Sequence, residues 1–352
     1  MIDKLIASLP KRLDGMLIVS EVNRLFFTGF QSSDGILLIT RNGSVFLTDS
    51  RYIEEARKQV TCCEVAELTN AKVELVDYCK KFKCRVLGVE ASKLTVNELW
   101  YFRKILKWIL LTASNTDRYI DDLRMIKSRA ETENIIKSQR IAEQAFDYIL
   151  GFIKEGVTEK EIALQLDFYM LSHGAQALSF ETIAISGANT SKPHGVPTDK
   201  AVQHGDFVTM DYGAVVNGYH SDMTRTVAVS AVSSEQEKIY NIVLEAQEKA
   251  LSGLKPDMLC SEGDKLARDV IAKAGYGEYF RHSTGHGVGV EIHEKPNLSP
   301  KSEQKLQIGN IVTVEPGIYI PEKFGVRIED MALITENGCE NLTKSPKKLI
   351  II

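Results

Sequence analysis

The chain has 352 residues, of which 44% are hydrophobic and 26% charged, and this ordinary balance excludes a largely disordered protein. Lys and Arg number 43 against 47 Asp and Glu, a formal charge of -4, so we expect no nucleic-acid partner and no membrane attachment. No apolar run approaches the roughly 18 residues of a membrane span. The charge-interrupted start and six cysteines without a CxxC pair predict a cytoplasmic protein with reduced thiols.

Residues 1–122 alternate between short apolar runs and helical stretches, which predicts a small α/β domain. Thr95 and Glu98 have the spacing of a capping box, and we expect a helix over 95–107. We expect strands at 16–20, 35–40, 44–48 and 85–90. The polar stretch 114–128 that follows is interpreted as a linker.

Residues 123–352 form a second domain in this interpretation, with helices and strands grouped rather than strictly alternating. Ser128 and Glu131 make another capping box that opens a long helix, and Thr158 with Glu161 starts the next. The expected helices are 128–154, 158–172, 234–254 and 260–274. The expected strands are 182–186, 206–215, 219–229, 311–320 and 325–335.

A first acidic hairpin lies in the segment FVTMDYGAVVNGYHSDMTRTVAV. Asn217-Gly218 between two strand-like runs predicts a two-residue turn, so that paired residue numbers sum to 435. Asp211 then faces Thr224, and Asp211 and Asp222 are diagonal neighbours on one face, about 7 to 8 Å apart at the backbone. Two converging carboxylates repel unless a cation lies between them. Two solvated aspartates on an edge hairpin remain the alternative for this segment alone.

A second acidic hairpin, IVTVEPGIYIPEKFGVRIEDMALIT, shifts the balance toward a functional site. A turn around 321–324 brings Glu315 opposite Glu329, and both interrupt strands that are otherwise apolar. Buried carboxylates without partners are costly, so two such hairpins are hard to explain as surface features. Arg327, two residues before Glu329, points to the same side as an ion-pair partner or as a group that orients ligands or holds a substrate carboxylate.

Histidines complete the set of candidate donors. Three of the seven lie in HSTGHGVGVEIHEKP, at His282, His286 and His293, and His194 follows another strand. The glycines near His286 are not followed by a helical pattern, so a phosphate-binding loop is a weak interpretation. Four carboxylates with an imidazole are typical of a two-metal centre that favours hard ions such as Mn²⁺. Such a pair of ions activates a water molecule near neutral pH.

These motifs resemble the pita-bread metallopeptidases, in the branch of Xaa-Pro dipeptidase (prolidase) and Xaa-Pro aminopeptidase (aminopeptidase P), from about Ser128 to the end. NRLFFTGF and FLTDSRY resemble, more loosely, the creatinase-like amino-terminal domain of that branch. The resemblance implies an α+β fold class. A creatinase-like α/β domain (1–122) would precede a pita-bread (creatinase/aminopeptidase-like) catalytic domain (123–352). It also implies a homodimer and two divalent metal ions per subunit, with Mn²⁺ favoured and Co²⁺ or Zn²⁺ as alternatives.

The resemblance assigns roles to individual residues. The implied metal ligands are Asp211, Asp222, His286, Glu315 and Glu329. The implied catalytic residues are His194, His293 and Glu315, and the implied substrate-binding residues are His194, His282, His293 and Arg327. Glu315 would move a proton toward the prolyl nitrogen and His293 would stabilise the oxyanion. The resemblance assigns no role to His220, which lies two residues before Asp222.

The implied activity is hydrolysis of the bond before proline in a proline-containing peptide. An Xaa-Pro dipeptidase and an aminopeptidase P acting on longer peptides both fit, and the sequence does not separate them or reveal the residue preferred before proline. A non-catalytic binding module with the same fold is the alternative from another class. Such modules typically lose ligands, whereas all five positions are present here.

Overall fold

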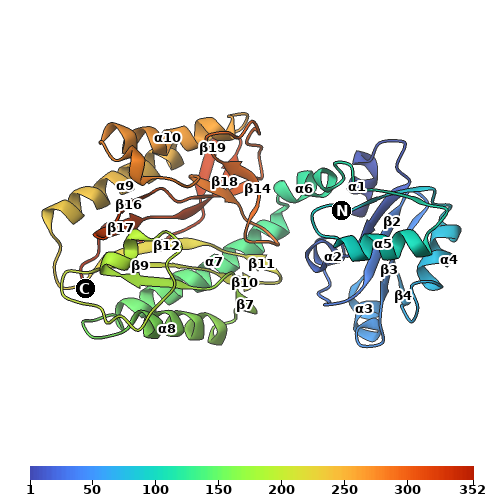
Figure 1. The fold of residues 1–352 in the computed structure, drawn as a ribbon, viewed down its shortest axis with the longest axis horizontal. Helices are drawn as coiled ribbons and strands as arrows, with labels where there is room; N and C mark the ends of the chain where they lie inside the picture. The colour runs from blue at the N-terminus through green and yellow to red at the C-terminus, as the bar shows by residue number, and fades with distance from the viewer. The chain divides into compact units, whose positions relative to one another are not determined.

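The computed structural model describes residues 1–352, and the chain divides into two compact units, Met1–Arg124 and Met125–Ile352. No helix combines the length and apolar composition that a membrane crossing requires. The first unit contains one six-stranded sheet in the order β4-β3-β2-β1-β5-β6 (Figure 1). Its strands are β1 Gly15–Ile18, β2 Ile36–Thr40, β3 Gly43–Thr48, β4 Glu64–Glu67, β5 Val86–Val89 and β6 Leu110–Thr112.

Helices in the first unit follow the alternation read from the sequence. Thr95 forms the expected capping box with Glu98 and begins α5. The helices are α1 Ile2–Ser8, α2 Glu21–Thr28, α3 Ile53–Gln59, α4 Glu74–Lys81, α5 Val96–Ile105 and α6 Asp117–Met125. The prediction of a linker over 114–128 was wrong, because α6 occupies most of it. The segment is rich in charged residues, but α6 buries the side chains of Tyr119 and Ile120.

The second unit packs its strands between two pairs of helices, which Figure 1 shows on opposite sides of the strands. Capping boxes at Ser128, Thr158 and Ser233 begin α7, α8 and α9. The helices are α7 Arg129–Leu150, α8 Glu159–Ser172, α9 Ser234–Gly253 and α10 Cys260–Lys273, with 3₁₀ turns η1 Gly187–Ser191 and η2 Gly277–Tyr279. The helix expected over 128–154 therefore ends four residues early, where Gly151 forms its C-cap.

Strands of the second unit form four small sheets, ordered β11-β10-β7, β12-β9-β8, β14-β13-β15-β18-β19 and β16-β17. Their bounds are β7 Ala177–Leu178, β8 Ile183–Ser186, β9 Phe207–Tyr212, β10 Ala214–Val216, β11 Tyr219–His220, β12 Met223–Ala228, β13 Gly285–Gly287, β14 Glu294–Leu298, β15 Ile311–Val314, β16 Gly317–Ile320, β17 Phe324–Arg327, β18 Asp330–Thr335 and β19 Gly338–Asn341.

The long strands expected from the sequence are each interrupted. The expected strand 206–215 breaks at Gly213, where an added Cβ would lie 1.9 Å from the carbonyl oxygen of Ser221. The expected strand 311–320 breaks at Glu315 and Pro316 because β15 pairs with β18 while β16 pairs with β17. A change of pairing partner therefore divides one apolar run into two strands.

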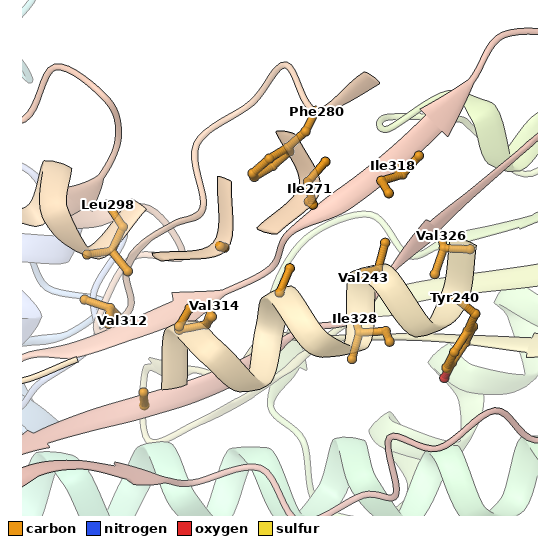
Figure 2. Packing of buried hydrophobic residues seen from close by; sticks show 14 of the residues in the cluster. Tyr240, Val243, Ile271, Phe280, Leu298, Val312, Val314, Ile318, Val326 and Ile328 are labelled. Atoms are coloured by element: carbon orange, nitrogen blue, oxygen red, sulfur yellow. The ribbon is translucent and has the colours of Figure 1, made fainter. Parts of the chain in front are cut away.

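Two hydrophobic cores support the strands from opposite sides. One core contains side chains of α9 and α10 packed on β15 to β18, and Figure 2 shows Tyr240 and Val243 of α9 near Val326 and Ile328. The other contains α7 and α8 packed on β8, β9 and β12. Full burial of one such aliphatic side chain contributes about 1.5–3 kcal/mol. The strands that carry polar side chains thus lie between two apolar layers.

Candidate metal centre and active site

A pocket of about 540 Å³ in the second unit collects the acidic and imidazole side chains singled out in the sequence. Asp222, Glu315 and Glu329 lie in short breaks between strands, namely β11/β12, β15/β16 and β17/β18. Asp211 lies in β9 and His286 in β13, and both also line the pocket. At each of the three breaks the chain leaves one pairing partner for another.

Strand register places the carboxylates as the hairpin arithmetic predicts. Thr224 pairs with Asp211 across the β9/β12 ladder, so the sum of 435 is confirmed. In the second hairpin Gly317 pairs with Arg327, and Val314 pairs with Asp330 beyond the break. Both pairs sum to 644, which brings Glu315 opposite Glu329.

Three of the five side chains converge most tightly. One ligand atom from each of Asp222, His286 and Glu329 lies within 4.8 Å of the others. His286 Nε2 is 3.5 Å from Asp222 Oδ2 and 3.5 Å from Glu315 Oε1. His286 Nδ1 lies 3.0 Å from the carbonyl oxygen of Gly287, so we assign its proton there and leave the Nε2 lone pair facing the carboxylates.

Electrostatics in this cluster are unfavourable without a cation. Burial, followed by the charges of Glu329, Asp211 and Glu315, raises the pKa of Asp222 well above its usual value. Burial and the charges of Glu315 and Asp211 likewise raise the pKa of Glu329. Burial raises the pKa of Glu315 to about 8 and lowers that of His286 to about 4. The protein therefore holds three acids that resist ionisation beside an imidazole that stays neutral.

The donor set fits divalent metal ions. Asp211 Oδ1 and Glu329 Oε1 are buried and have no hydrogen-bond partner, although buried polar atoms are normally satisfied. A cation among the carboxylates would supply the missing interaction and cancel the repulsion. Carboxylate oxygens with one imidazole nitrogen suit hard or borderline divalent ions rather than soft ones.

Arg327 is buried at the edge of this cluster and is engaged by several acceptors. Its Nη2 is 2.7 Å from Asp211 Oδ2, its Nη1 is 2.9 Å from the Tyr319 hydroxyl, and its Nε is 3.0 Å from Thr224 Oγ1. The Tyr319 hydroxyl accepts from Arg327 and lies 2.9 Å from His282 Nε2, to which it donates. Arg327 thus holds one oxygen of Asp211, and the other oxygen is buried without a hydrogen-bond partner.

The other three candidate histidines, His194, His282 and His293, occupy different parts of the same pocket. His194 lines it from the loop after η1. The ring of His293 packs edge-on against His286, with 4.4 Å between ring centroids. His282 has both ring nitrogens within hydrogen-bond distance of protein groups, and burial with the charge of Arg327 lowers its pKa to about 4. Apolar side chains complete the lining, among them Phe180, Ile183, Val196 and Ile292.

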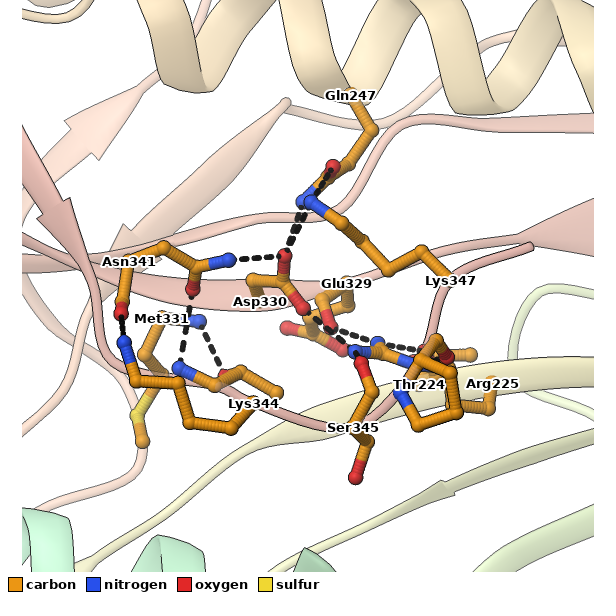
Figure 3. Close-up of polar contacts among 12 residues, drawn as sticks. Thr224, Arg225, Gln247, Glu329, Asp330, Met331, Asn341, Lys344, Ser345 and Lys347 are labelled. Carbon is orange, nitrogen blue, oxygen red and sulfur yellow. Dashed lines mark hydrogen bonds and ion pairs between the residues drawn. The ribbon is translucent and has the colours of Figure 1, made fainter.

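A second polar network supports the strands from behind. The Arg225 guanidinium donates to the carbonyl oxygen of Glu329 at 2.6 Å and to Asp330 Oδ1 at 2.7 Å. The other oxygen of Asp330 accepts from Gln247, Asn341 and Lys347 (Figure 3). This network fixes the backbone on which Glu329 is carried.

Some residues that shape the site were not found in the sequence. Tyr319 joins His282 to Arg327, Thr224 Oγ1 donates to Glu329 Oε2 at 2.7 Å, and Thr313 Oγ1 donates to Glu315 Oε1 at 3.1 Å. A signal existed for each of them: Thr224 is the predicted cross-strand partner of Asp211. Tyr319 and Thr313 are an even number of residues from Glu315, which places them on its face of an extended chain.

Comparisons with known proteins match both units. Residues 133–336 match the model of metallopeptidase family M24, and residues 2–126 match the creatinase/prolidase N-terminal domain. An Xaa-Pro dipeptidase of Pyrococcus furiosus is 39% identical over 340 residues, covering 96% of this chain and 95% of that protein. Among solved structures, an Xaa-Pro dipeptidase from Bacillus anthracis is 41% identical with a TM-score of 0.96, covering 100% of this chain and 99% of that one. An X-Pro aminopeptidase from Thermotoga maritima is 33% identical with a TM-score of 0.92, at the same coverages.

Proposed function

The chain belongs to metallopeptidase family M24, and from this membership we propose that it hydrolyses the Xaa-Pro bond at the amino terminus of dipeptides, as an Xaa-Pro dipeptidase. The resemblance inferred from the motifs is confirmed, and with it the α+β class with a creatinase-like amino-terminal part and a pita-bread catalytic part. Family membership implies the use of divalent metal. The ions proposed here are two per subunit, with Mn²⁺ preferred over Co²⁺ or Zn²⁺.

One observation supports this proposal above the others: a buried group of carboxylates and one neutral imidazole in which two oxygens lack any partner. Five side chains would hold the metal, namely Asp211, Asp222, His286, Glu315 and Glu329. Bound divalent ions supply an activated water molecule and a Lewis acid for the scissile carbonyl. A non-catalytic module would have no reason to keep this costly arrangement.

Other pocket residues would act on the peptide itself. Glu315, whose Oε1 is already oriented by Thr313, would carry a proton to the prolyl nitrogen as the bond breaks. His293 would donate to the oxygen of the carbonyl that is attacked, and His194 would contact the substrate near that bond. His282 and Arg327 would bound the proline side of the pocket, where Tyr319 links them.

Aminopeptidase P activity on longer peptides is the second candidate, and the state of Arg327 favours it. A dipeptidase must capture the proline carboxylate, yet Arg327 already donates to Asp211, Tyr319, Thr224 and the carbonyl of Pro193. The residues that line the pocket include no lysine and no other arginine. The proline carboxylate of a dipeptide would therefore have to bind the one remaining N–H of Arg327 or a histidine side chain.

Hydrolysis of Ala-Pro and Ala-Pro-Ala by metal-stripped protein, with and without added Mn²⁺, tests both candidates. Mn²⁺-dependent cleavage of Ala-Pro alone supports the dipeptidase, and cleavage of Ala-Pro-Ala supports the aminopeptidase. Stoichiometric Mn²⁺ uptake without cleavage of either peptide contradicts the proline specificity. Absence of uptake of Mn²⁺, Co²⁺ and Zn²⁺ alike contradicts the metal centre and favours a non-catalytic module.

We also propose that residues 1–122 form the creatinase-like domain and residues 123–352 form the catalytic domain. The break between compact units after Arg124 supports this division. A homodimer in the cytoplasm is proposed as well, and the six free cysteines are consistent with a reducing compartment. Light scattering on the purified protein measures the subunit number directly.

A further inference from the structure

The loop from η1 to the start of β9 supplies part of the pocket but none of the proposed metal ligands. Five consecutive residues, 193–197, line the pocket, and His194 is the only one of them with an ionisable side chain. Few bonds hold this stretch directly: Gly195 N donates to Lys192 O, and Pro193 O accepts from Arg327. Val196 is 72% exposed at the pocket rim. The position of His194 therefore depends on how the two ends of the loop are fixed.

Glu159, the first residue of α8, joins those two ends. Its side chain is completely buried, at 0% exposure. Its Oε1 accepts from the backbone N–H of Ser186 at 2.7 Å and from Asn189 Nδ2 at 3.0 Å, before the pocket segment. Its Oε2 accepts from the backbone N–H of Thr198 at 3.0 Å and from Thr198 Oγ1 at 2.6 Å, after the segment. One carboxylate thus ties residues 186–189 to residue 198, beside the backbone bond from Lys160 N to Thr198 O and the bond from Lys200 Nζ to Ser186 Oγ.

Capping of α8 does not account for this arrangement. Thr158 and Glu161 already form a complete capping box at the same helix end. A buried carboxylate without a direct cationic partner is expensive, and it persists only where several donors satisfy it. The donors that satisfy Glu159 come from both sides of residues 193–197 and from nowhere on α8.

We propose that Glu159 is a positioning residue that holds the 193–197 loop so that His194 faces the bound peptide. This role rests on the proposed peptidase function and acts on substrate binding rather than on the metal. Glu159 lies in none of the segments that carry the five proposed ligands. Removing its charge should change the loop and leave the metal affinity intact.

Glu159→Gln is the main test, with Glu161→Gln as the matched control in the same turn. Glutamine keeps the shape but places an NH₂ group against donors that need an acceptor. We expect kcat/KM for the Xaa-Pro peptide to fall about 10- to 100-fold, mainly through KM, which is the scale of a misplacement near 1 Å. The side chain of Glu161 bonds only within its capping box, so Glu161→Gln should change kcat/KM less than about twofold. Mn²⁺ affinity measured by calorimetry should stay within threefold of wild type in both.

A double-mutant cycle with His194→Ala separates positioning from general destabilisation. If Glu159 acts through His194, Glu159→Gln should lower kcat/KM by less than about threefold when His194→Ala is already present. An undiminished penalty in that background would overturn the proposal, as would loss of Mn²⁺ affinity in step with activity. Should Glu159→Gln not fold, Thr198→Val removes one donor and is expected to show a smaller penalty with the same dependence on His194.

Hydrogen exchange distinguishes this inference from the proposed function. Wild-type protein that takes up Mn²⁺ but cleaves no Xaa-Pro peptide would contradict the function only. Faster exchange over residues 186–198 in Glu159→Gln than in Glu161→Gln would still support the inference that Glu159 positions the loop. Equal exchange in the two variants would overturn it.

Discussion

Glu329 and Asp330 are neighbours in the chain and are both buried, yet their carboxylates face opposite electrostatic surroundings. Around Glu329 lie Glu315 and Asp211, and burial with these like charges raises its pKa. Around Asp330 lie Arg225 and Lys347, whose charges outweigh the effect of burial and lower its pKa. Every oxygen of Asp330 has a partner, whereas Glu329 Oε1 has none. A satisfied buried carboxylate supports the fold, and an unsatisfied one marks a place for a ligand.

The largest expected effect comes from removing the unsatisfied acid. Glu329→Gln should abolish both stoichiometric Mn²⁺ binding and peptidase activity, because the proposed site loses a charged ligand. The metal-free variant should unfold at a urea concentration no lower than the metal-free wild type, since one repelling carboxylate is gone. Metal analysis, peptide hydrolysis and urea unfolding in EDTA measure the three quantities. Retained activity would refute the ligand assignment.

Removal of the satisfied acid should act on stability instead. Asp330→Ala leaves Arg225 and Lys347 without their buried partner and should lower the free energy of unfolding by about 3–5 kcal/mol. The loss should be similar with and without Mn²⁺. Asp269→Ala is the matched control, because its ion pair with Lys265 is at the surface, and its loss should change the free energy of unfolding far less than Asp330→Ala does. A stability loss seen only in the presence of Mn²⁺ would contradict the distinction.

Glu315, whose charge acts on Glu329, and Asp330 should also differ in their dependence on pH. The pKa of Glu315 in the folded, metal-free protein is raised from 4.5 to about 8, so folding retains a proton that the unfolded chain releases between these values. Stability of the metal-free protein should therefore fall as pH rises from about 4.5 to about 8, by on the order of 1 kcal/mol or more. Asp330 acts in the opposite sense, since its lowered pKa contributes stability that is lost on acidification.

Urea unfolding in EDTA at pH 5 and pH 8 measures this dependence. Saturating Mn²⁺ should remove the decline, because ions offset the repulsion among the carboxylates. A decline of equal size in the presence of Mn²⁺ would mean that the ions do not bind among these groups.

The smallest expected effect concerns the hydroxyl that links Arg327 to His282. Tyr319→Phe removes two hydrogen bonds but no charge, and should lower kcat/KM about 5- to 10-fold, equivalent to about 1 kcal/mol. Mn²⁺ affinity should change by less than tenfold, because Asp211 keeps its ion pair with Arg327. Steady-state kinetics and calorimetry test both statements. A complete loss of Mn²⁺ binding would show that Arg327 depends on Tyr319 to orient Asp211.

The sequence by itself determined much about this protein. Capping boxes located the starts of α5, α7 and α8, and the Asn217-Gly218 turn fixed the register that pairs Asp211 with Thr224. These features are local, because a turn or a cap involves residues within a few positions of one another. The family followed from the two acidic hairpins and the histidine segment.

Tertiary structure decided the breaks and the partners. Glu315 and Glu329 lie at breaks in runs read as continuous strands, because the chain changes pairing partner there. Arg327 could be assigned to a substrate or to a ligand from the sequence, and only the fold places Asp211 Oδ2 2.7 Å from it. Glu159 gave no sequence signal, since its donors are 27 to 39 residues away. Such contacts depend on which segments pack together, and local pattern does not carry that information.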